Sequence, residues 1–152
     1  MMAGMSEMSR RDFGAALAML AAIGAKAEGQ VAWDGGSLGK SKVFAPALVK
    51  QANGSERWVV LDGTFATGEA VSMHESVAPA GTPKVAAHVI KHSELIVVVE
   101  GTMAFEHDGV VDPVQAGSVI YVAYGTNHRV WNTGETAARY VVMQMGGDTK
   151  KA

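Results

Sequence analysis

The sequence predicts a single all-β domain, built as a sandwich or barrel of many short strands. Runs of β-branched and aromatic residues recur at short spacing, and turn residues separate them. Glycine makes up 18 of the 152 residues, and no segment beyond the N-terminus keeps a helical period for long. The length is that of one domain, so these observations favour one β domain without a second unit.

The expected strands follow one another along the chain and are separated by turns. The clearest turn is Asp108 followed by Gly109, because this pair lies between two apolar runs and suits a two-residue hairpin. Asp62 with Gly63 marks a further turn. We expect strands at residues 57–61, 69–77, 85–90, 94–99, 102–107, 110–114, 118–123, 128–132 and 137–145.

Residues 1–27 have the pattern of an export signal. Arg10 and Arg11 precede an apolar run at residues 14–25, and small residues surround a cleavage site after Ala27. Two arginines followed by an aspartate and a phenylalanine are typical of twin-arginine signals, so we expect export by that route, to the periplasm or otherwise out of the cytoplasm. An ordinary secretory signal and an amphipathic leading helix are the alternatives.

The apolar run of this signal is too short to cross a bilayer as a helix, so we expect no permanent membrane anchor. Cleavage after the signal would leave a leader or arm at residues 28–42, a barrel at 43–147 and a tail at 148–152.

The charge and the absence of cysteine exclude several classes of function. The net charge is −2 without a basic block, so a nucleic acid is not an expected partner. The chain has no cysteine, which rules out disulfides, thiolate metal sites and cysteine nucleophiles. Any metal must therefore be bound by nitrogen and oxygen ligands.

Histidine and glutamate residues occur in two spaced motifs. The first reads His88-x5-Glu94-x6-Gly101, and the second reads Gly117-x7-Gly125-x2-His128-x3-Asn132. Over residues 42–146 the chain resembles the cupin superfamily, whose paired motifs carry these residue types in this order. The resemblance implies a single antiparallel jelly-roll barrel of about six to eight strands.

The resemblance implies that the chain retains three ligands of the family's metal site: His88, Glu94 and His128. Ile90 stands at the position where the family usually has a second histidine. Two imidazoles and one carboxylate form the facial triad of non-haem Fe(II) oxygenases. The resemblance therefore implies one divalent ion per chain, with Fe or Mn favoured and Zn, Ni or Cu as alternatives. His92 either replaces the lost ligand or lies in a loop at the barrel mouth.

Two other departures from the family pattern are smaller. Gly81 is displaced by one position from the family's first glycine, and Ala123 replaces a proline. Asn132 is retained, and we expect it to hydrogen-bond within the barrel and to position the strand that carries His128.

If the metal ligands point into the barrel, the period-2 alternation of strands directs their neighbours there too. The pocket is then largely apolar, which suits a small, weakly polar organic molecule and not a phosphate or a nucleotide. The expected lining residues are Ile90, Ile96, Val98 and Val130.

The remaining histidines are expected to lie outside the site. His107 adjoins the turn at Asp108 and is expected to be solvated. His74 alternates with serines opposite an apolar face, which predicts an exterior position. Glu75 shares that apolar face and is either a paired charge at the rim or an acid in the pocket.

These features predict an exported metal-dependent enzyme that acts on a small organic molecule. Oxygenase chemistry with Fe or Mn is the first expectation, followed by isomerase or lyase chemistry on the same metal. The alternatives are a non-catalytic cupin that binds a small ligand or a metal, and a metal-free cupin that acts through a dimer face. The resemblance also implies a homodimer, in which residues 43–49 join the partner's sheet.

Overall fold

A computed structural model describes residues 30–31, 36–50 and 54–149 of the chain. The export signal expected at residues 1–27 lies outside the described residues. The described residues form strands and no helix, which confirms the all-β class. Accordingly, these residues contain no helix long and apolar enough to cross a membrane.

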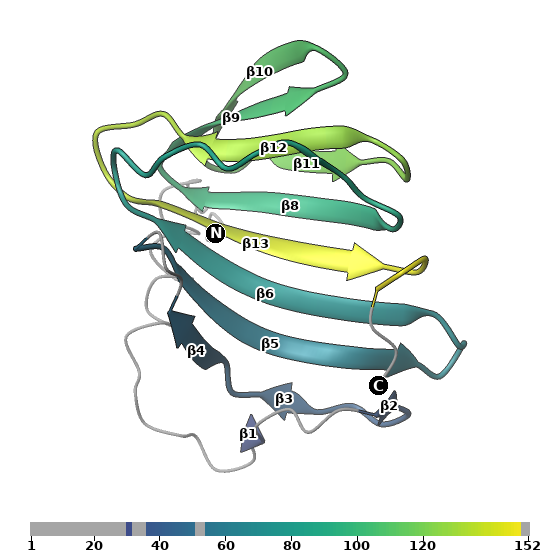
Figure 1. The fold of residues 1–152 in the computed structure, drawn as a ribbon. Coiled ribbons are helices and arrows are strands. Elements are labelled where there is room, and N and C mark those ends of the chain that lie inside the picture. Colours follow the sequence, from purple (N-terminus) through teal and green to yellow (C-terminus); the bar gives the residue numbers. More distant parts are fainter. Residues whose placement is uncertain (1–29, 32–35, 51–53, 150–152) are drawn as a thin grey trace, which may run out of the picture.

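Two sheets form the barrel (Figure 1). The larger sheet contains β2 (Ser37–Leu38), β4 (Ala47–Lys50), β5 (Glu56–Phe65), β6 (Ala70–Ala78), β8 (Ser93–Glu100), β11 (Val119–Val122) and β13 (Ala138–Met145). The smaller sheet contains β7 (His88–Val89), β9 (Thr102–His107), β10 (Val110–Gln115) and β12 (Asn127–Asn132). The strand orders are β11-β8-β13-β6-β5-β2, with β4 also paired to β5, and β10-β9-β12-β7. This is the jelly-roll barrel that the resemblance implies, but its two sheets contain eleven strands and not the expected six to eight.

The apolar core lies between the two sheets. Alternation along β8 points Ile96 and Val98 inward, and both are buried. Removing such side chains from water is the main stabilising contribution to a fold of this kind, at roughly 25 cal/mol per Å² of apolar surface. The buried cluster consists of Ile90, Ile96, Val98, Met103, Phe105, Val114, Ile120, Val122, Ala138 and Val142.

One expected strand is mostly a loop. Of the segment at residues 85–90, only the two residues of β7 pair, and residues 79–87 form no strand. Gly81, with a φ of 73°, and Pro83, which has no backbone N–H to donate, keep the residues before this segment out of the sheet, and residues 85–87 continue the same loop. The loop becomes part of the wall of a cavity described below.

The expected hairpin at Asp108 and Gly109 is confirmed. These residues have φ values of 47° and 82°, as a two-residue turn with two left-handed positions requires. They connect β9 to β10, which pair antiparallel. Pro113 lies within β10, where it is tolerated because β10 is an edge strand.

The segments at both ends of the barrel pair within the chain. β4, which belongs to the segment expected to join a partner's sheet, pairs antiparallel with β5 of the same chain. A short parallel pair is formed by β1 (Gln30–Val31) and β3 (Val43–Phe44). At the other end, the backbone N–H of Asp148 donates to the carbonyl of Lys91 at 3.0 Å, and Thr149 is buried. The first residues of the expected tail thus pack on the barrel, and the homodimer stays a prediction.

Candidate functional site

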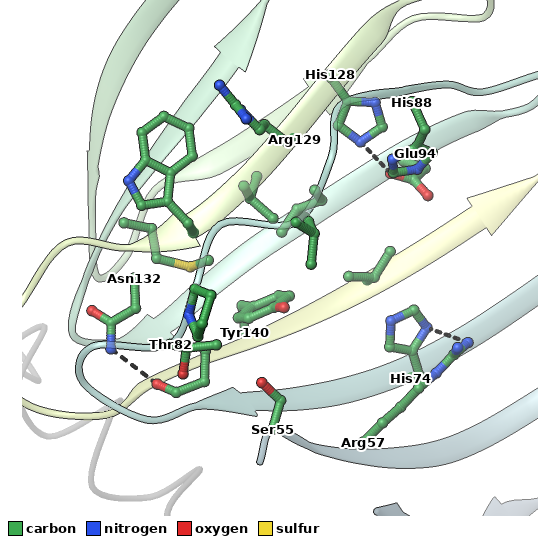
Figure 2. Close-up of a pocket in the computed structure, with 18 of the residues that line it drawn as sticks. Ser55, Arg57, His74, Thr82, His88, Glu94, His128, Arg129, Asn132 and Tyr140 are labelled. Carbon is green, nitrogen blue, oxygen red and sulfur yellow. Dashed lines mark hydrogen bonds and ion pairs between the residues drawn. The ribbon is translucent and has the colours of Figure 1, made fainter. Parts of the chain in front are cut away.

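A cavity of about 290 Å³ lies between the two sheets. Residues of β5, β6, β8 and β13 line one side, and residues of β12 and the loop at 79–87 line the other. In that loop, Lys84 places Nζ 4.1 Å from the centroid of the Trp131 ring, which holds the loop against β12. Figure 2 shows the lining side chains around this cavity. Its volume suits a small molecule.

Glu94 and His128 form the most buried polar pair of the cavity, with exposed fractions of 5% and 3%. Nε2 of His128 lies 3.3 Å from Oε2 of Glu94 (Figure 2). The other carboxylate oxygen, Oε1, accepts from Nε2 of Gln144 at 2.8 Å and from Nε2 of His92 at 3.0 Å. Burial alone would raise the pKa of Glu94, but hydrogen bonds from His128, His92 and Gln144 outweigh burial and lower this pKa to about 2.

The charge on Glu94 fixes the orientation of the proton on His128. An ionised carboxylate only accepts hydrogen bonds, so Nε2 of His128 is the donor in their contact. Nδ1 of His128 is buried and has no hydrogen-bond partner. The ring of His88 packs against the ring of His128, with 4.8 Å between their centroids. Nδ1 is therefore the nitrogen that carries no proton in the neutral His128 ring, and its neighbours cover it in this structure.

The cavity wall is more polar than the sequence predicts. Ile96 and Val130 line the cavity as expected, whereas Ile90 and Val98 pack in the apolar core and not on the cavity wall. The expectation of a largely apolar pocket is wrong, because the inward positions of several strands carry polar side chains. The polar and charged lining residues are Ser55, Arg57, His74, Thr82, His88, Glu94, His128, Arg129, Asn132, Tyr140 and Gln144.

Seven of these lining residues were not expected in the site, and Arg57 and His74 are two of them. The prediction of an exterior His74 is wrong: it lines the cavity, and its Nδ1 lies 3.1 Å from Nη2 of Arg57. Ser72 and Ser76, which alternate with His74 on β6, are buried as well. Burial, and next the positive charge of Arg57, lower the pKa of His74 to about 4, so its ring is neutral at pH 7.

His92 does not take the place of the family's second histidine. Its Nδ1 lies 2.8 Å from Oδ1 of Asp148, and its Nε2 contacts Glu94, so both ring nitrogens are occupied. Burial lowers the pKa of His92, but its hydrogen bonds with Asp148 and Glu94 raise this pKa by more. The pKa of His92 therefore lies above its ordinary value. His92 lines a second cavity of about 290 Å³, together with Arg57, Asp62, Ser72, Gln144, Asp148 and Thr149.

Asn132 is fully hydrogen-bonded at the end of β12. Its Nδ2 donates to the carbonyls of Ala78 at 2.9 Å and Thr136 at 2.7 Å, and its Oδ1 accepts from the N–H of Gly134 at 2.8 Å. These bonds tie β12 to β6 and to the turn that follows β12. Asn132 therefore holds the strand that carries His128.

Glu75 and His107, the two other candidate residues of the sequence analysis, have partners other than Glu94. Glu75 accepts a hydrogen bond from Nη1 of Arg139 at 2.7 Å, so of the two alternatives it is the paired charge. His107 has its Nε2 2.9 Å from Oδ2 of Asp112, and its ring stacks on Phe105 with 4.6 Å between centroids. His107 does not line the cavity.

Comparisons with known proteins show which families and solved structures this barrel resembles. Residues 73–144 match the family Cupin_2, described as a cupin domain. The matched segment is 72 of the 152 residues, and over it the barrel is similar to cupin domains. None of the curated proteins compared with the chain matches it.

Solved structures show the same cupin fold at low sequence identity. An RmlC-like cupin from Shewanella frigidimarina superposes with a TM-score of 0.54 at 17% identity, over 68% of this chain and 86% of that one. A Cupin 2 conserved barrel domain protein from Salinispora arenicola gives 0.52 at 20%, over 64% and 80%. A predicted oxalate decarboxylase from Thermotoga maritima gives 0.50 at 19%, over 66% and 90%.

The cupin domains that residues 73–144 resemble commonly bind a metal, so the donor set of this chain bears on that chemistry. Within residues 30–31, 36–50 and 54–149, no three His, Cys, Asp or Glu side chains are grouped so that they could hold a metal ion. Ile90 fills the position of one family ligand, and Oε1 of Glu94 is occupied by His92 and Gln144. The side chains as they lie do not fit a resident ion.

Proposed function

We propose that this protein is a cupin and a small-molecule enzyme in which Glu94 and His128 act as a proton-transfer pair. The observation that carries the proposal is the 3.3 Å contact between Oε2 of Glu94 and Nε2 of His128 at the cavity wall. The carboxylate orients the imidazole and stabilises its charged form, while Nδ1 serves as the base once a bound molecule displaces the exposed His88 ring that packs against His128. The reaction class is proton abstraction at a carbon beside a carbonyl or carboxyl group, as in an isomerisation.

The proposed step conserves charge and needs no oxidant. Nδ1 of His128 takes the proton of a substrate C–H bond, and the electron pair of that bond delocalises into the neighbouring carbonyl. The proton then returns to the same carbon or to another carbon of the substrate. Glu94 stays ionised throughout, because three donors lower its pKa to about 2.

Deuterium incorporation tests this function whatever the product of the reaction is. A panel of small carbonyl compounds and organic acids is incubated in D₂O with the protein, and loss of α-proton signals is followed by ¹H NMR. We expect exchange in at least one compound, with a fall of about 10²-fold or more in His128→Gln and Glu94→Gln. Glu75→Gln, which changes a carboxylate outside the cavity, serves as the control. Exchange that is equally fast in all four proteins would rule the pair out.

A metal-dependent cupin, with the Fe or Mn oxygenase chemistry that the sequence predicts, is the second candidate. Two observations favour it: the short separation of Oε2 of Glu94 and Nε2 of His128, and the contact between the rings of His88 and His128. The three side chains would hold the ion only after His88, which is exposed, changes its rotamer. A bound ion would supply Lewis-acid or redox chemistry.

Elemental analysis of the full chain, purified beside His128→Ala, separates the two candidates. About one Fe or Mn per chain, lost in the variant, would favour the metal enzyme. Trace metal that is equal in both samples would favour the proton-transfer pair.

A further inference from the structure

Arg57 on β5 and His74 on β6 form a second polar pair in the same cavity (Figure 2). The distance from Nη2 of Arg57 to Nδ1 of His74 is 3.1 Å. A guanidinium only donates hydrogen bonds, so Nδ1 accepts and the proton of the neutral ring lies on Nε2. The low pKa of His74 agrees with this neutral ring. The pair therefore offers a cation and an N–H, and no acceptor, to the cavity.

Arg57 differs from the other arginines of the described barrel in having no ion pair. Arg129 contacts Glu106 at 2.6 Å, and Arg139 contacts Glu75 at 2.7 Å. Among the described residues, no carboxylate forms such a contact with Arg57. The Nε atom of Arg57 is buried and has no hydrogen-bond partner. Asp62 lines the second cavity together with Arg57 but forms no ion pair with it.

An unpaired cation inside a cavity raises the free energy of the folded state, because it loses hydration without gaining a counter-charge. The carboxylate of Glu94 does not compensate Arg57, since three other side chains occupy it. An anionic group of a bound molecule would provide the missing counter-charge. A carboxylate is suited to this role, because it accepts charge-assisted hydrogen bonds from a guanidinium and from a ring N–H together.

The register of the larger sheet places apolar side chains between the two polar pairs. Val142 on β13 is paired with His74 on β6 and with Ile96 on β8. Val142 and Ile96 both line the cavity. A molecule whose anionic end contacts Arg57 would therefore lay a short apolar body along these two residues, toward Glu94 and His128.

We propose that Arg57 and His74 bind the carboxylate of the ligand, so that the substrates of this cavity are small organic acids with a short apolar body. This inference rests on the proposed function of the same cavity and adds its substrate class. The apolar side chains of Val142 and Ile96 would contact the apolar body of the ligand, and the unpaired charge of Arg57 would bind its carboxylate.

The inference is tested with matched probes that differ in charge. Butyrate, butyramide and inorganic phosphate are titrated into the full chain, and the Nε–H signal of Arg57 is followed in ¹H–¹⁵N NMR spectra. We expect saturable shifts with butyrate and at least tenfold weaker binding of butyramide. Equal affinities for butyrate and butyramide, saturation by phosphate alone, or no saturable binding of butyrate would overturn the inference.

Variants locate the binding to this pair. Arg57→Gln is expected to weaken butyrate binding at least tenfold, and His74→Phe severalfold. Arg139→Gln removes a positive charge whose ion pair lies outside the cavity, and it should change the affinity less than twofold. Unchanged affinity in Arg57→Gln contradicts the inference. Should Arg57→Gln fail to fold, the comparison of butyrate with butyramide in the unmodified chain still decides.

Failure of the substrate class and failure of the proton-transfer pair give different results. Saturable butyrate binding at Arg57, without deuterium exchange in any acid of the panel, would support the carboxylate site and overturn the proton-transfer function. Exchange in neutral carbonyl compounds, with KM unchanged in Arg57→Gln, would support proton transfer and overturn the carboxylate site.

Discussion

Glu94 and His128 meet across the two sheets of the barrel. Glu94 lies on β8 of the larger sheet and His128 on β12 of the smaller one, and Oε2 and Nε2 are 3.3 Å apart. Both side chains are buried, so the contact is protected from water and strengthened by the low local dielectric. One interaction therefore links the two sheets and sets which nitrogen of His128 carries the proton of the neutral ring.

Replacing the carboxylate of Glu94 should destabilise the fold. Glu94→Gln places an amide NH₂ among three donors, so one or more buried donors lose their acceptor. We expect the free energy of unfolding to fall by about 2 kcal/mol, measured by urea unfolding at pH 7. Glu75→Gln breaks a partly exposed ion pair with Arg139 and should cost less than about 1 kcal/mol. Equal losses in the two variants would contradict this account of Glu94.

Acid should destabilise the fold through His74. Its pKa is about 4 in the folded chain, because burial and Arg57 disfavour the imidazolium, against an ordinary value of 6.5. Between these two values the unfolded chain binds more protons, so stability falls as the pH falls from 6.5 toward 4. His74→Gln removes this loss. Urea unfolding at several pH values should therefore show a shallower decline in the variant, with parallel curves above pH 7; identical slopes below pH 6.5 would exclude the effect.

Removing the unpaired charge of Arg57 should stabilise the unliganded protein. Arg57→Met keeps the aliphatic part of the side chain and removes the uncompensated cation. We expect the free energy of unfolding to rise by about 1 kcal/mol, seen as a higher Tm without ligand. Arg139→Met, which leaves Glu75 without its partner, should lower the Tm instead. A lower Tm in Arg57→Met would show that the charge of Arg57 is already compensated.

Restoring the family's second histidine should create a metal site. Ile90 is 3% exposed in the core cluster, so Ile90→His buries a polar ring and should cost about 2 kcal/mol or more without metal. Added Zn²⁺ or Ni²⁺ should then raise the Tm of Ile90→His by several degrees more than that of the unmodified chain. Ile90→His/His128→Ala is the control, and its Tm should not respond. Equal responses of Ile90→His and the unmodified chain would argue against the loss of a ligand at Ile90.

Substitution of Gly101 should destabilise the fold more than substitution of Gly81, although both glycines have a positive φ. Gly101 has a φ of 80°, and a Cβ there would lie 2.9 Å from the carbonyl oxygen of Ala137. Gly81 has a φ of 73°, and a Cβ there would meet no atom within 4 Å. Gly101→Ala should cost about 2 kcal/mol more than Gly81→Ala, because it adds a steric clash to the same backbone strain. Similar Tm values for the two variants would refute the close approach at Gly101.

The sequence predicts most of the strands for local reasons, but the turn expected at Asp62 and Gly63 is wrong, because both residues lie within β5 and pair with β6. Short apolar runs and turn residues define the strands, and the hairpin at Asp108 and Gly109 follows from the φ values that these residues tolerate. The spacing of Glu94 and His128 matches the cupin motifs. The motifs do not say whether those residues hold a metal. The oxygens that Glu94 could offer to an ion depend on its contacts with His92 and Gln144, and no motif describes these contacts.

The Arg57–His74 pair lies beyond what the strand pattern predicts. Alternation on β6 suggests that the apolar face points inward, but both faces of this strand are buried, with Val71 at 1% and Ser72 at 8% exposure. The partner of His74 lies 17 residues away, and the register of β5 against β6 shifts between Val59 and Leu61. That shift lies beyond Val59, which is the register partner of His74, and Arg57 reaches His74 from two residues earlier on β5. Strand alternation does not say which residue of a neighbouring strand meets His74, so the polar half of the cavity appears only in the folded structure.

The protonation of the His128 ring tests the central claim most directly. A ¹⁵N spectrum of the histidine rings at pH 8, with His128→Gln used to assign the signals, reports which nitrogen carries the proton. The account predicts a proton on Nε2, where Glu94 accepts it, and a bare Nδ1. A proton on Nδ1 with Nε2 bare, or loss of the His128 signals through a bound paramagnetic ion, would contradict the proton-transfer pair and favour a metal centre.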